Sequence, residues 1–167
     1  MIKPGTGTSA TALTTILLVL FLVLLTGCKA NPKDFHSNGL SITLTSDFKE
    51  RKMNEYTVYL IGSDVSFTAK EETNDSLIRN GYNISTLEDY CAALINMNGQ
   101  RSSDVNRRGN YYYFVNEVTT DGTNYTYVNC MLKGSNSYWL CKFIVKADNY
   151  DKYKENIFAW ADTITVE

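Results

Sequence analysis

The chain has 167 residues, with 16 lysines and arginines against 18 aspartates and glutamates, a formal net charge of −2 and a calculated pI of about 5.5. This balance leaves no basic excess for a nucleic-acid partner, and we expect none. Tyrosine is frequent (12 residues) and proline scarce (2), which favours a sheet-rich domain.

A signal segment opens the chain. Lys3 precedes an apolar run at 16–25, and small residues follow it, which is the order of a secretory signal. The run is short for a membrane-spanning helix, which needs about 20 apolar residues, although an uncleaved anchor is the alternative. The tetrapeptide Leu25–Cys28 (Leu-Thr-Gly-Cys) resembles the lipobox of bacterial lipoproteins. The resemblance implies that Cys28 is lipidated, with acyl groups such as palmitate, and becomes the first mature residue.

These features divide the chain into a cleaved signal peptide (1–27), a lipidated tether (28–37) and a single globular domain (38–167). Each buried acyl methylene contributes about 0.8 kcal/mol, so an anchor of several chains is effectively permanent. We therefore expect a protein on the extracytoplasmic face of the bacterial cell membrane. Its partners are then the membrane, through the lipid on Cys28, and a protein at the cell surface.

The domain begins with a strand and a hairpin. Leu40, Ile42 and Leu44 alternate with polar residues, which predicts a half-buried strand. In chain order the sequence then predicts strands at 56–61 and 65–70, a polar loop at 71–82, and an amphipathic helix that Asn98 and Gly99 end. Ser85 and Glu88 form the capping box of that helix.

The second half of the domain is an antiparallel meander followed by a helix. The sequence predicts strands at 111–118, 125–133 and 138–146, a helix capped by Asp148 or Asn149, and a short strand at 163–166. With Asp121–Gly122 and Ser135–Asn136 at the hairpin tips, Cys130 lies opposite both Cys141 and Tyr113. Both faces of the meander are then apolar and need cover. We predict an α+β domain with a central antiparallel β-sheet sandwiched between helices, in three α/β/α layers.

Four segments carry a resemblance to a known family. They are Asn38–Leu44, Ser85–Tyr90, Ser137–Phe143 and Tyr153–Val166. Together with the element order they resemble the PsbP-like family, over nearly all of the domain. The chain departs from the commonest family pattern because Thr45–Asp47 stands where a proline usually follows the first strand.

The resemblance implies an antiparallel sheet between helices and a binding or accessory role. Proteins of this wider fold include an extrinsic subunit of photosystem II and a nuclear-import factor that binds the Ran GTPase, and many bacterial members are lipoproteins. A fold does not imply a function, so the resemblance favours binding only in general terms. A cystatin-like or NTF-like α+β fold is the alternative.

No catalytic constellation stands out. His36 is the single histidine, and no serine or cysteine motif accompanies it, so we predict an exposed lead-in residue. Cys91, Cys130 and Cys141 lack the C-x-x-C spacing of zinc and redox sites, and we expect no metal and no cofactor. Cys130 and Cys141 leave two interpretations open, a strained cross-strand disulfide or two reduced core thiols.

Three hypotheses of function follow. The first is a membrane-tethered binding or accessory scaffold whose contact residues lie in the loops at 71–82 and 100–108. In the second loop Arg101, Arg107 and Arg108 form either a solvated turn or a basic patch for an acidic partner. The second hypothesis is a small-molecule or ion carrier with a tyrosine-lined pocket. The candidate tyrosines are Tyr111, Tyr112, Tyr113, Tyr125 and Tyr127. An enzyme is the weakest hypothesis, because no nucleophile–base pair is found.

Overall fold

The computed structural model describes residues 31–97, 99, 101 and 104–167. Cys28, the predicted signal peptide and Asn98, the first of the two residues predicted to end the first helix, lie outside the described residues. The described strands are β1 (Pro32–Ser37), β2 (Leu40–Thr45), β3 (Lys49–Glu50), β4 (Val58–Ile61), β5 (Val65–Thr73), β6 (Asn106–Arg108), β7 (Tyr111–Thr120), β8 (Thr123–Lys133), β9 (Ser137–Lys146) and β10 (Thr165–Val166). The described helices are α2 (Asn74–Arg79), α3 (Leu87–Met97), the 3₁₀ turn η2 (Ala147–Asn149) and α4 (Tyr150–Ala161).

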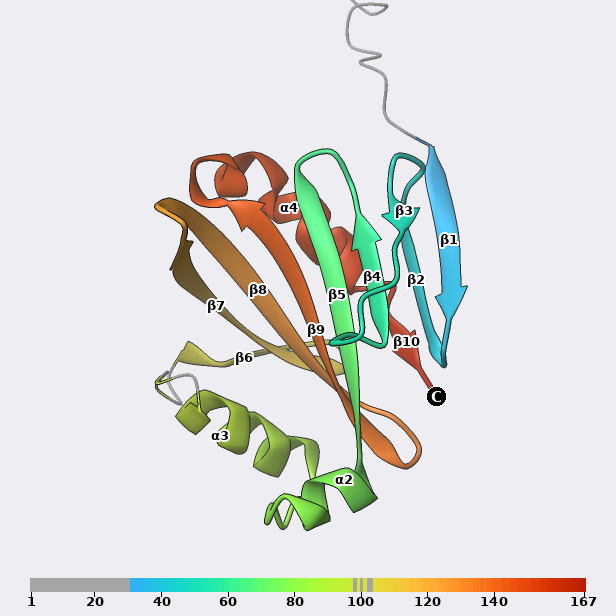
Figure 1. Cartoon of the computed structure of the whole chain (residues 1–167), viewed down its shortest axis with the longest axis vertical. Coiled ribbons are helices and arrows are strands. Elements are labelled where there is room, and N and C mark those ends of the chain that lie inside the picture. The colour runs from blue at the N-terminus through green and yellow to red at the C-terminus, as the bar shows by residue number, and fades with distance from the viewer. Residues whose placement is uncertain (1–30, 98, 100, 102–103) are drawn as a thin grey trace, which may run out of the picture. The chain divides into compact units, whose positions relative to one another are not determined.

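The larger sheet in the described part of the chain is antiparallel, with seven strands in the order β3-β4-β5-β9-β8-β7-β6 (Figure 1). Its middle is the predicted meander of β7, β8 and β9. Asp121 and Gly122 form the β7–β8 turn with φ of 50° and 74°, the left-handed values that a two-residue type I′ turn requires. Cys130 pairs with Tyr113 on one side and with Cys141 on the other, so the predicted register is confirmed.

A second sheet, with three strands among the described residues, has the order β1-β2-β10. We expected residues 28–37 to be a tether, but Pro32–Ser37 pairs with β2 along its whole length. Only Phe35 of this strand is buried. An edge strand with one inward side chain has no apolar alternation, and its sequence therefore looks like a polar linker.

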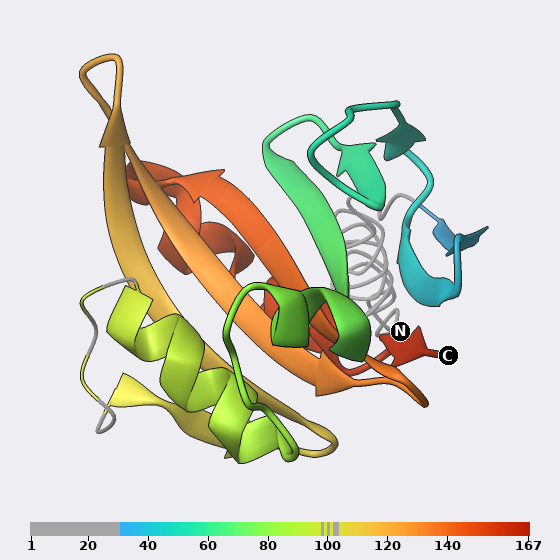
Figure 2. The same ribbon diagram turned by 60° about the horizontal axis from the view of Figure 1, so that its bottom comes forward.

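Cover lies on both faces of the larger sheet, and Figures 1 and 2 show α4 on the side opposite α3. The main core packs against α4 and the inner side of β2. It includes Tyr111, Val128, Cys130, Leu132, Trp139, Cys141, Phe143, Val145, Ile157 and Ala161. A smaller core packs against α2 and α3. It consists of Leu77, Tyr90, Cys91, Leu94, Ile95, Phe114, Met131 and Tyr138. The predicted fold class, a sheet between helices, is confirmed.

The start of α3 differs from the prediction by one residue. The helix begins at Leu87, so its N-cap is Thr86 and the reciprocal partner is Asp89. The Asp89 backbone N–H donates to Thr86 Oγ1 at 3.1 Å, and the Thr86 N–H donates to Asp89 Oδ2 at 3.0 Å. Hydrogen bonding to the Asp89 carboxylate lowers its pKa to about 2, with the Thr86 side chain as the largest cause, followed by the backbone N–H groups of Ser85 and Thr86 and the Ser85 side chain. Glu88 instead accepts a hydrogen bond from the Tyr112 hydroxyl, at 2.7 Å.

Two further local predictions are wrong. Residues 71–82 are not one loop, because β5 continues to Thr73 and α2 follows directly, with Thr73 Oγ1 accepting from the Ser76 N–H at 3.2 Å. At the start of α4, Asn149 occupies the N-cap position but its side chain makes no capping hydrogen bond. The 3₁₀ turn η2 leads the chain straight into the helix instead.

Candidate functional site

On the α3 side of the larger sheet, the helices cover only part of the face, and this cover stops halfway along the strands. Eleven residues of α3 make a helix about 16 Å long, whereas the eleven residues of β8 extend for about 37 Å. The helix therefore reaches only the strand ends nearest the β8–β9 turn, around Met131 and Leu140. We call the remaining part of this face the open face. By strand register it carries Tyr59, Ile61, Ser66, Thr68, Lys70, Asn116, Val118, Tyr125, Tyr127, Asn129, Lys142 and Ile144.

Tyrosines gather on the open face. Tyr56, in the segment between β3 and β4, places its ring centroid 6.0 Å from that of Tyr59. Burial is the largest cause of the raised pKa of Tyr56, and the charges of Glu55, Tyr127 and Tyr59 raise this pKa further. Tyr56, Tyr59, Tyr125 and Tyr127 are each half-buried.

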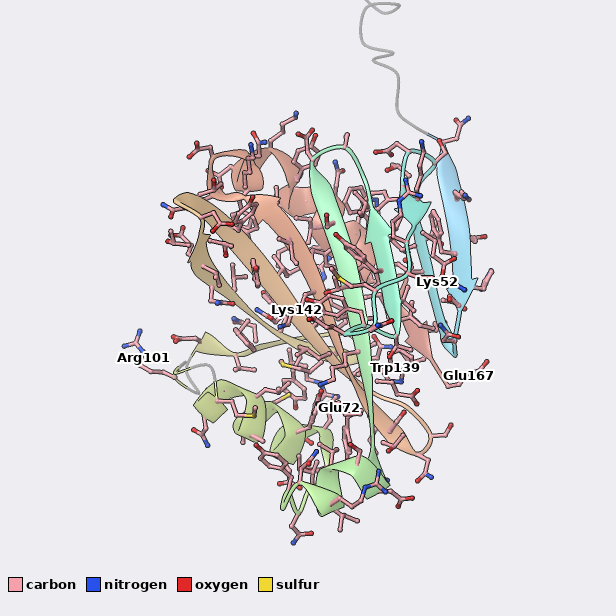
Figure 3. All side chains as sticks on the ribbon, in the orientation of Figure 1. Lys52, Glu72, Arg101, Trp139, Lys142 and Glu167 are labelled. Carbon is pink, nitrogen blue, oxygen red and sulfur yellow. The ribbon has the colours of Figure 1, made fainter. Side chains whose placement is uncertain are left out.

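Lys142 lies in the middle of the open face (Figure 3). Thr68 is its partner on β5 and Asn129 its partner on β8. Burial is the main cause that lowers the pKa of Lys142, the charge of Lys70 adds to it, and Glu72 opposes it. Glu72 pairs with Lys70 at 3.2 Å. No described carboxylate lies within ion-pair distance of Lys142, so this half-buried cation makes no ion pair in the described part of the chain.

Beside Lys142 lies a buried hydroxyl with no hydrogen bond. Thr68 is 2% exposed, and its Oγ1 atom has no partner among the described residues. Asn129, which is 3% exposed on the other side of Lys142, is satisfied, because its Nδ2 donates to Asn116 Oδ1 at 2.8 Å. A buried polar atom without a partner costs about 1–3 kcal/mol. The open face therefore keeps an unsatisfied polar atom next to an unpaired cation.

A hollow of about 210 Å³ continues the open face toward the β4–β5 turn. It is lined by Ser63, Asp64, Ser66, Tyr125, Ile144, Val145, Lys146 and Asn149. Asp64 Oδ2 accepts a hydrogen bond from the Tyr153 hydroxyl at 2.5 Å and lies 4.0 Å from Lys152 Nζ. Two side chains of α4 therefore fix the position of Asp64 at the edge of the hollow.

The three described cysteines are buried free thiols. Gly134 and Ser137 form the hydrogen-bonded pair that closes the β8–β9 turn, through a Gly134 N–H to Ser137 C=O bond of 2.9 Å. Alternation along the ladder makes Cys130 and Cys141 a hydrogen-bonded pair as well. Facing Cβ atoms in such pairs are about 5.5 Å apart, against about 3.8 Å in a disulfide. Of the two predicted states, the structure has the reduced core thiols.

Burial raises the pKa of all three thiols, to about 12 for Cys91. A raised pKa keeps a thiol protonated and poorly nucleophilic at neutral pH. Cys91 lies in the small core beneath α3, as its position on the apolar stripe of the helix predicts. The cysteines therefore serve as packing residues in this arrangement.

His36 makes a side-chain contact that the sequence does not indicate. Its Nδ1 lies 2.7 Å from Ser41 Oγ on β2, so a serine does accompany it in space. A catalytic triad also needs a carboxylate on the other ring nitrogen. The nearest candidate on the same strand, Asp34, instead accepts from Thr43 Oγ1 at 2.6 Å. These exposed bonds join β1 to β2 and form no relay.

The arginines of the predicted basic cluster do not form one patch. Arg108 makes a bidentate pair with Asp162 at the end of α4, with Nε at 2.7 Å and Nη2 at 2.6 Å. Arg107 lies over the Tyr112 ring, 5.5 Å from its centroid. Arg101 lies 3.6 Å from Asp104, and part of the 100–108 loop is outside the described residues.

The five tyrosines proposed for a carrier lie on three surfaces. Tyr111 and Tyr113 pack on the α4 side of the sheet. Tyr112 lines a separate hollow of about 520 Å³ beside α3, and Tyr125 lines the hollow of the open face. Tyr127 joins Tyr125 on the open face. The sequence thus identified two of the relevant tyrosines and missed Tyr56 and Tyr59.

Two observations on the described residues bear on other kinds of site. No group of three or more histidine, cysteine, aspartate or glutamate side chains gathers there in a way that could hold a metal ion. None of the helices in the described ranges has both the length and the apolar character needed to cross a membrane.

Comparison with known proteins gives the fold and no more. No protein-family model matches the sequence, and no curated protein matches it. A crystal structure of a protein from Bacteroides thetaiotaomicron matches with a TM-score of 0.57 and 17% identity over 81% of this chain, which spans 48% of that protein, about half its length. The Ran-binding protein Mog1p of Saccharomyces cerevisiae matches with a TM-score of 0.51 and 8% identity, over 83% of this chain and 96% of that one.

A solution structure of cyanobacterial PsbP from Synechocystis has a TM-score of 0.41 and 13% identity, over 85% of this chain and 95% of that one. The likeness to Mog1p covers nearly the whole of both chains. At identities this low it shows the fold alone. This chain therefore shares the α+β fold of Mog1p, a sheet with helices on both sides.

Proposed function

We propose that this protein is a lipid-anchored extracytoplasmic binding protein that holds a partner protein against its open face. The observation that carries the proposal is the uncovered half of the sheet, where tyrosines surround an unpaired lysine and an unsatisfied hydroxyl. Tyrosine supplies large contact area at low entropic cost and is enriched in binding hot spots. A face of this composition is suited to a protein contact.

The partner has a definable chemistry. Covering Lys142 would bury its charge further, and a buried charge needs a counter-charge to be tolerated. The matching group is an aspartate or glutamate that reaches Lys142 between the tyrosines. A hydrogen-bonding group beside it would satisfy the Thr68 hydroxyl, which has no partner among the described residues. We therefore expect an acidic side chain at the centre of the partner's contact surface.

Two further considerations support the proposal. Mog1p, which has the same fold, is a Ran-binding protein, so the fold has at least one use in protein binding. That precedent carries no information about which partner this chain binds. The lipobox pattern at Leu25–Cys28 would hold the domain at a membrane surface, where a membrane-bound partner is concentrated in two dimensions.

A photo-crosslinking amino acid at position 127 tests the binding face in native envelopes. We expect one discrete adduct from this position, and none from the same group at Met97, which is 65% exposed on α3. Lys142→Glu should remove the adduct and Lys142→Arg should keep it, because only the first reverses the charge. Identical adducts from both positions, no adduct at position 127, or an adduct that Lys142→Glu leaves unchanged would each overturn the proposal.

The anchor is tested separately. Cys28→Ala should release the protein from membranes or leave it unprocessed, because the acyl chains have no other attachment. Membrane fractionation and the mass of the mature protein give the readout. Unchanged mass together with unchanged membrane attachment would contradict the lipobox interpretation and would leave the crosslinking result intact.

A further inference from the structure

The outer edge of β7 is the second unusual feature beside the open face. β6 pairs only with Tyr111–Tyr113, so the rest of β7, from Phe114 to Thr120, has a described strand on one side only. Figure 1 shows β7 at the margin of the sheet, and Figure 2 shows the β7–β8 hairpin reaching past the other strands. Seven residues of strand therefore present a free edge.

The turn geometry identifies which backbone groups face outward. The two-residue turn at Asp121 and Gly122 makes Thr120 and Thr123 a hydrogen-bonded pair. Alternate residues of β7 then bond to β8, and the residues between them point their N–H and C=O groups away from it. These outward residues on the free edge are Val115, Glu117 and Thr119. The same alternation gives the outward groups of Tyr111 and Tyr113 to β6, in agreement with the observed register.

Natural sheet edges are usually blunted by a bulge, a proline, a covering segment or several charges. The β7–β8 register is continuous from Tyr112 to Thr120, which excludes a bulge. The edge contains no proline, and its single charge is Glu117, an exposed residue without an ion pair among the described residues. This edge is therefore open to another strand.

The charge of Glu117 determines which kind of strand can pair with the free edge of β7. Two copies of this chain could pair edge to edge, but the register that uses all three outward residues of both copies is centred on Glu117. Each Glu117 would then face its counterpart, and like charges directly opposite each other destabilise a strand pair. A strand of another protein with lysine or arginine opposite Glu117 meets no such repulsion.

We propose that β7 accepts an extended segment of a partner protein as an added strand, with a basic residue opposite Glu117. The inference rests on the proposed function for the existence of a protein partner, and it specifies how that partner is held. Asn116 and Val118 lie on the open face, so the added strand would extend that face by one strand. Backbone hydrogen bonds to Val115, Glu117 and Thr119 would supply affinity in this binding mode.

The test uses the full chain in detergent micelles and two synthetic peptides. Each peptide has nine residues of alternating valine and threonine, with lysine at the centre of one and glutamate at the centre of the other. Amide hydrogen exchange measured by NMR is the readout. We expect the lysine-centred peptide to slow exchange at Val115, Glu117 and Thr119, and the glutamate-centred peptide to bind about fivefold more weakly.

Proline supplies a variant that removes only the outward N–H. Glu117→Pro deletes a donor that β8 does not use, and proline is tolerated on edge strands in that orientation. We expect it to weaken binding of the lysine-centred peptide about tenfold or more. Thr119→Pro, nearer the hairpin tip, tests the same edge if Glu117→Pro reduces the melting temperature. Glu117→Gln keeps the N–H and should bind both peptides equally.

Two results would overturn the inference: unchanged exchange at the three outward amides with the lysine-centred peptide, or undiminished binding by both proline variants. The crosslinking experiment separates this failure from failure of the proposed function. An adduct at position 127 that persists in Glu117→Pro would leave the open face as the binding site and exclude strand addition. Absence of that adduct in the unmodified chain would refute the proposed function itself.

Discussion

Thr68→Val should stabilise the protein, which is unusual for a substitution at a buried position. The Thr68 side chain is 2% exposed, and its hydroxyl has no hydrogen-bond partner among the described residues. Valine has nearly the same shape and no polar atom, so the change removes the cost of an unsatisfied hydroxyl, about 1–3 kcal/mol. At the lower end of that range, 1 kcal/mol raises the melting temperature of a domain of this size by about 3–4 °C.

The control is Thr163→Val, at an exposed threonine whose hydroxyl is hydrogen-bonded. Thr163 Oγ1 donates to the Trp160 carbonyl at 2.7 Å and accepts from the Thr43 N–H at 2.9 Å, so valine there should destabilise by about 1 kcal/mol. Thermal unfolding followed by circular dichroism measures both variants. A lower melting temperature for Thr68→Val would mean that the hydroxyl is bonded in solution, and the description of the open face would then be wrong.

Two further predictions concern the core and its border. The Arg108 side chain is the first cause that lowers the pKa of Asp162, so their pair stabilises the fold above the ordinary value of 3.8 and loses this contribution as pH falls through the lower folded value. Arg108→Gln should lower the free energy of unfolding by about 1 kcal/mol at pH 7, and it should reduce the dependence of the melting temperature on pH below about pH 4. An unchanged pH profile would contradict this. Cys130 and Cys141 should be unreactive toward a thiol reagent in the folded protein and should both react in denaturant without reductant. Failure of both to react would indicate the disulfide.

The sequence predicts the long elements well and the short ones poorly. The strands of the meander carry alternating apolar residues and strong turn signals, so even the pairing of Cys130 with Cys141 follows from counting. β1 buries only Phe35, and the six-residue helix α2 buries only Leu77. Elements with one inward side chain leave no periodic pattern, and the sequence therefore predicts polar connections at both places.

The open face was missed for a different reason. The sequence correctly indicates two apolar faces, but it does not show how far a helix reaches along a strand. Polar residues at neighbouring positions of three strands, Thr68, Lys142 and Asn129, mark the line where cover by α3 ends. Each is unremarkable alone, and the line becomes visible only when the register is known. The Ser85–Glu88 capping box failed similarly, because Thr86 and Asp89 offer the same motif one residue later.

The most direct test of the account compares tyrosine reactivity in two settings. Nitration of Tyr125 and Tyr127, read by mass spectrometry, reports whether the open face is covered, and Tyr82, between α2 and α3, serves as the reference. If a partner occupies the open face, Tyr125 and Tyr127 should react several-fold less in native envelopes than in the purified protein, while Tyr82 reacts equally in both. Equal reactivity of all three tyrosines in the two settings would contradict the central claim that this face binds a partner.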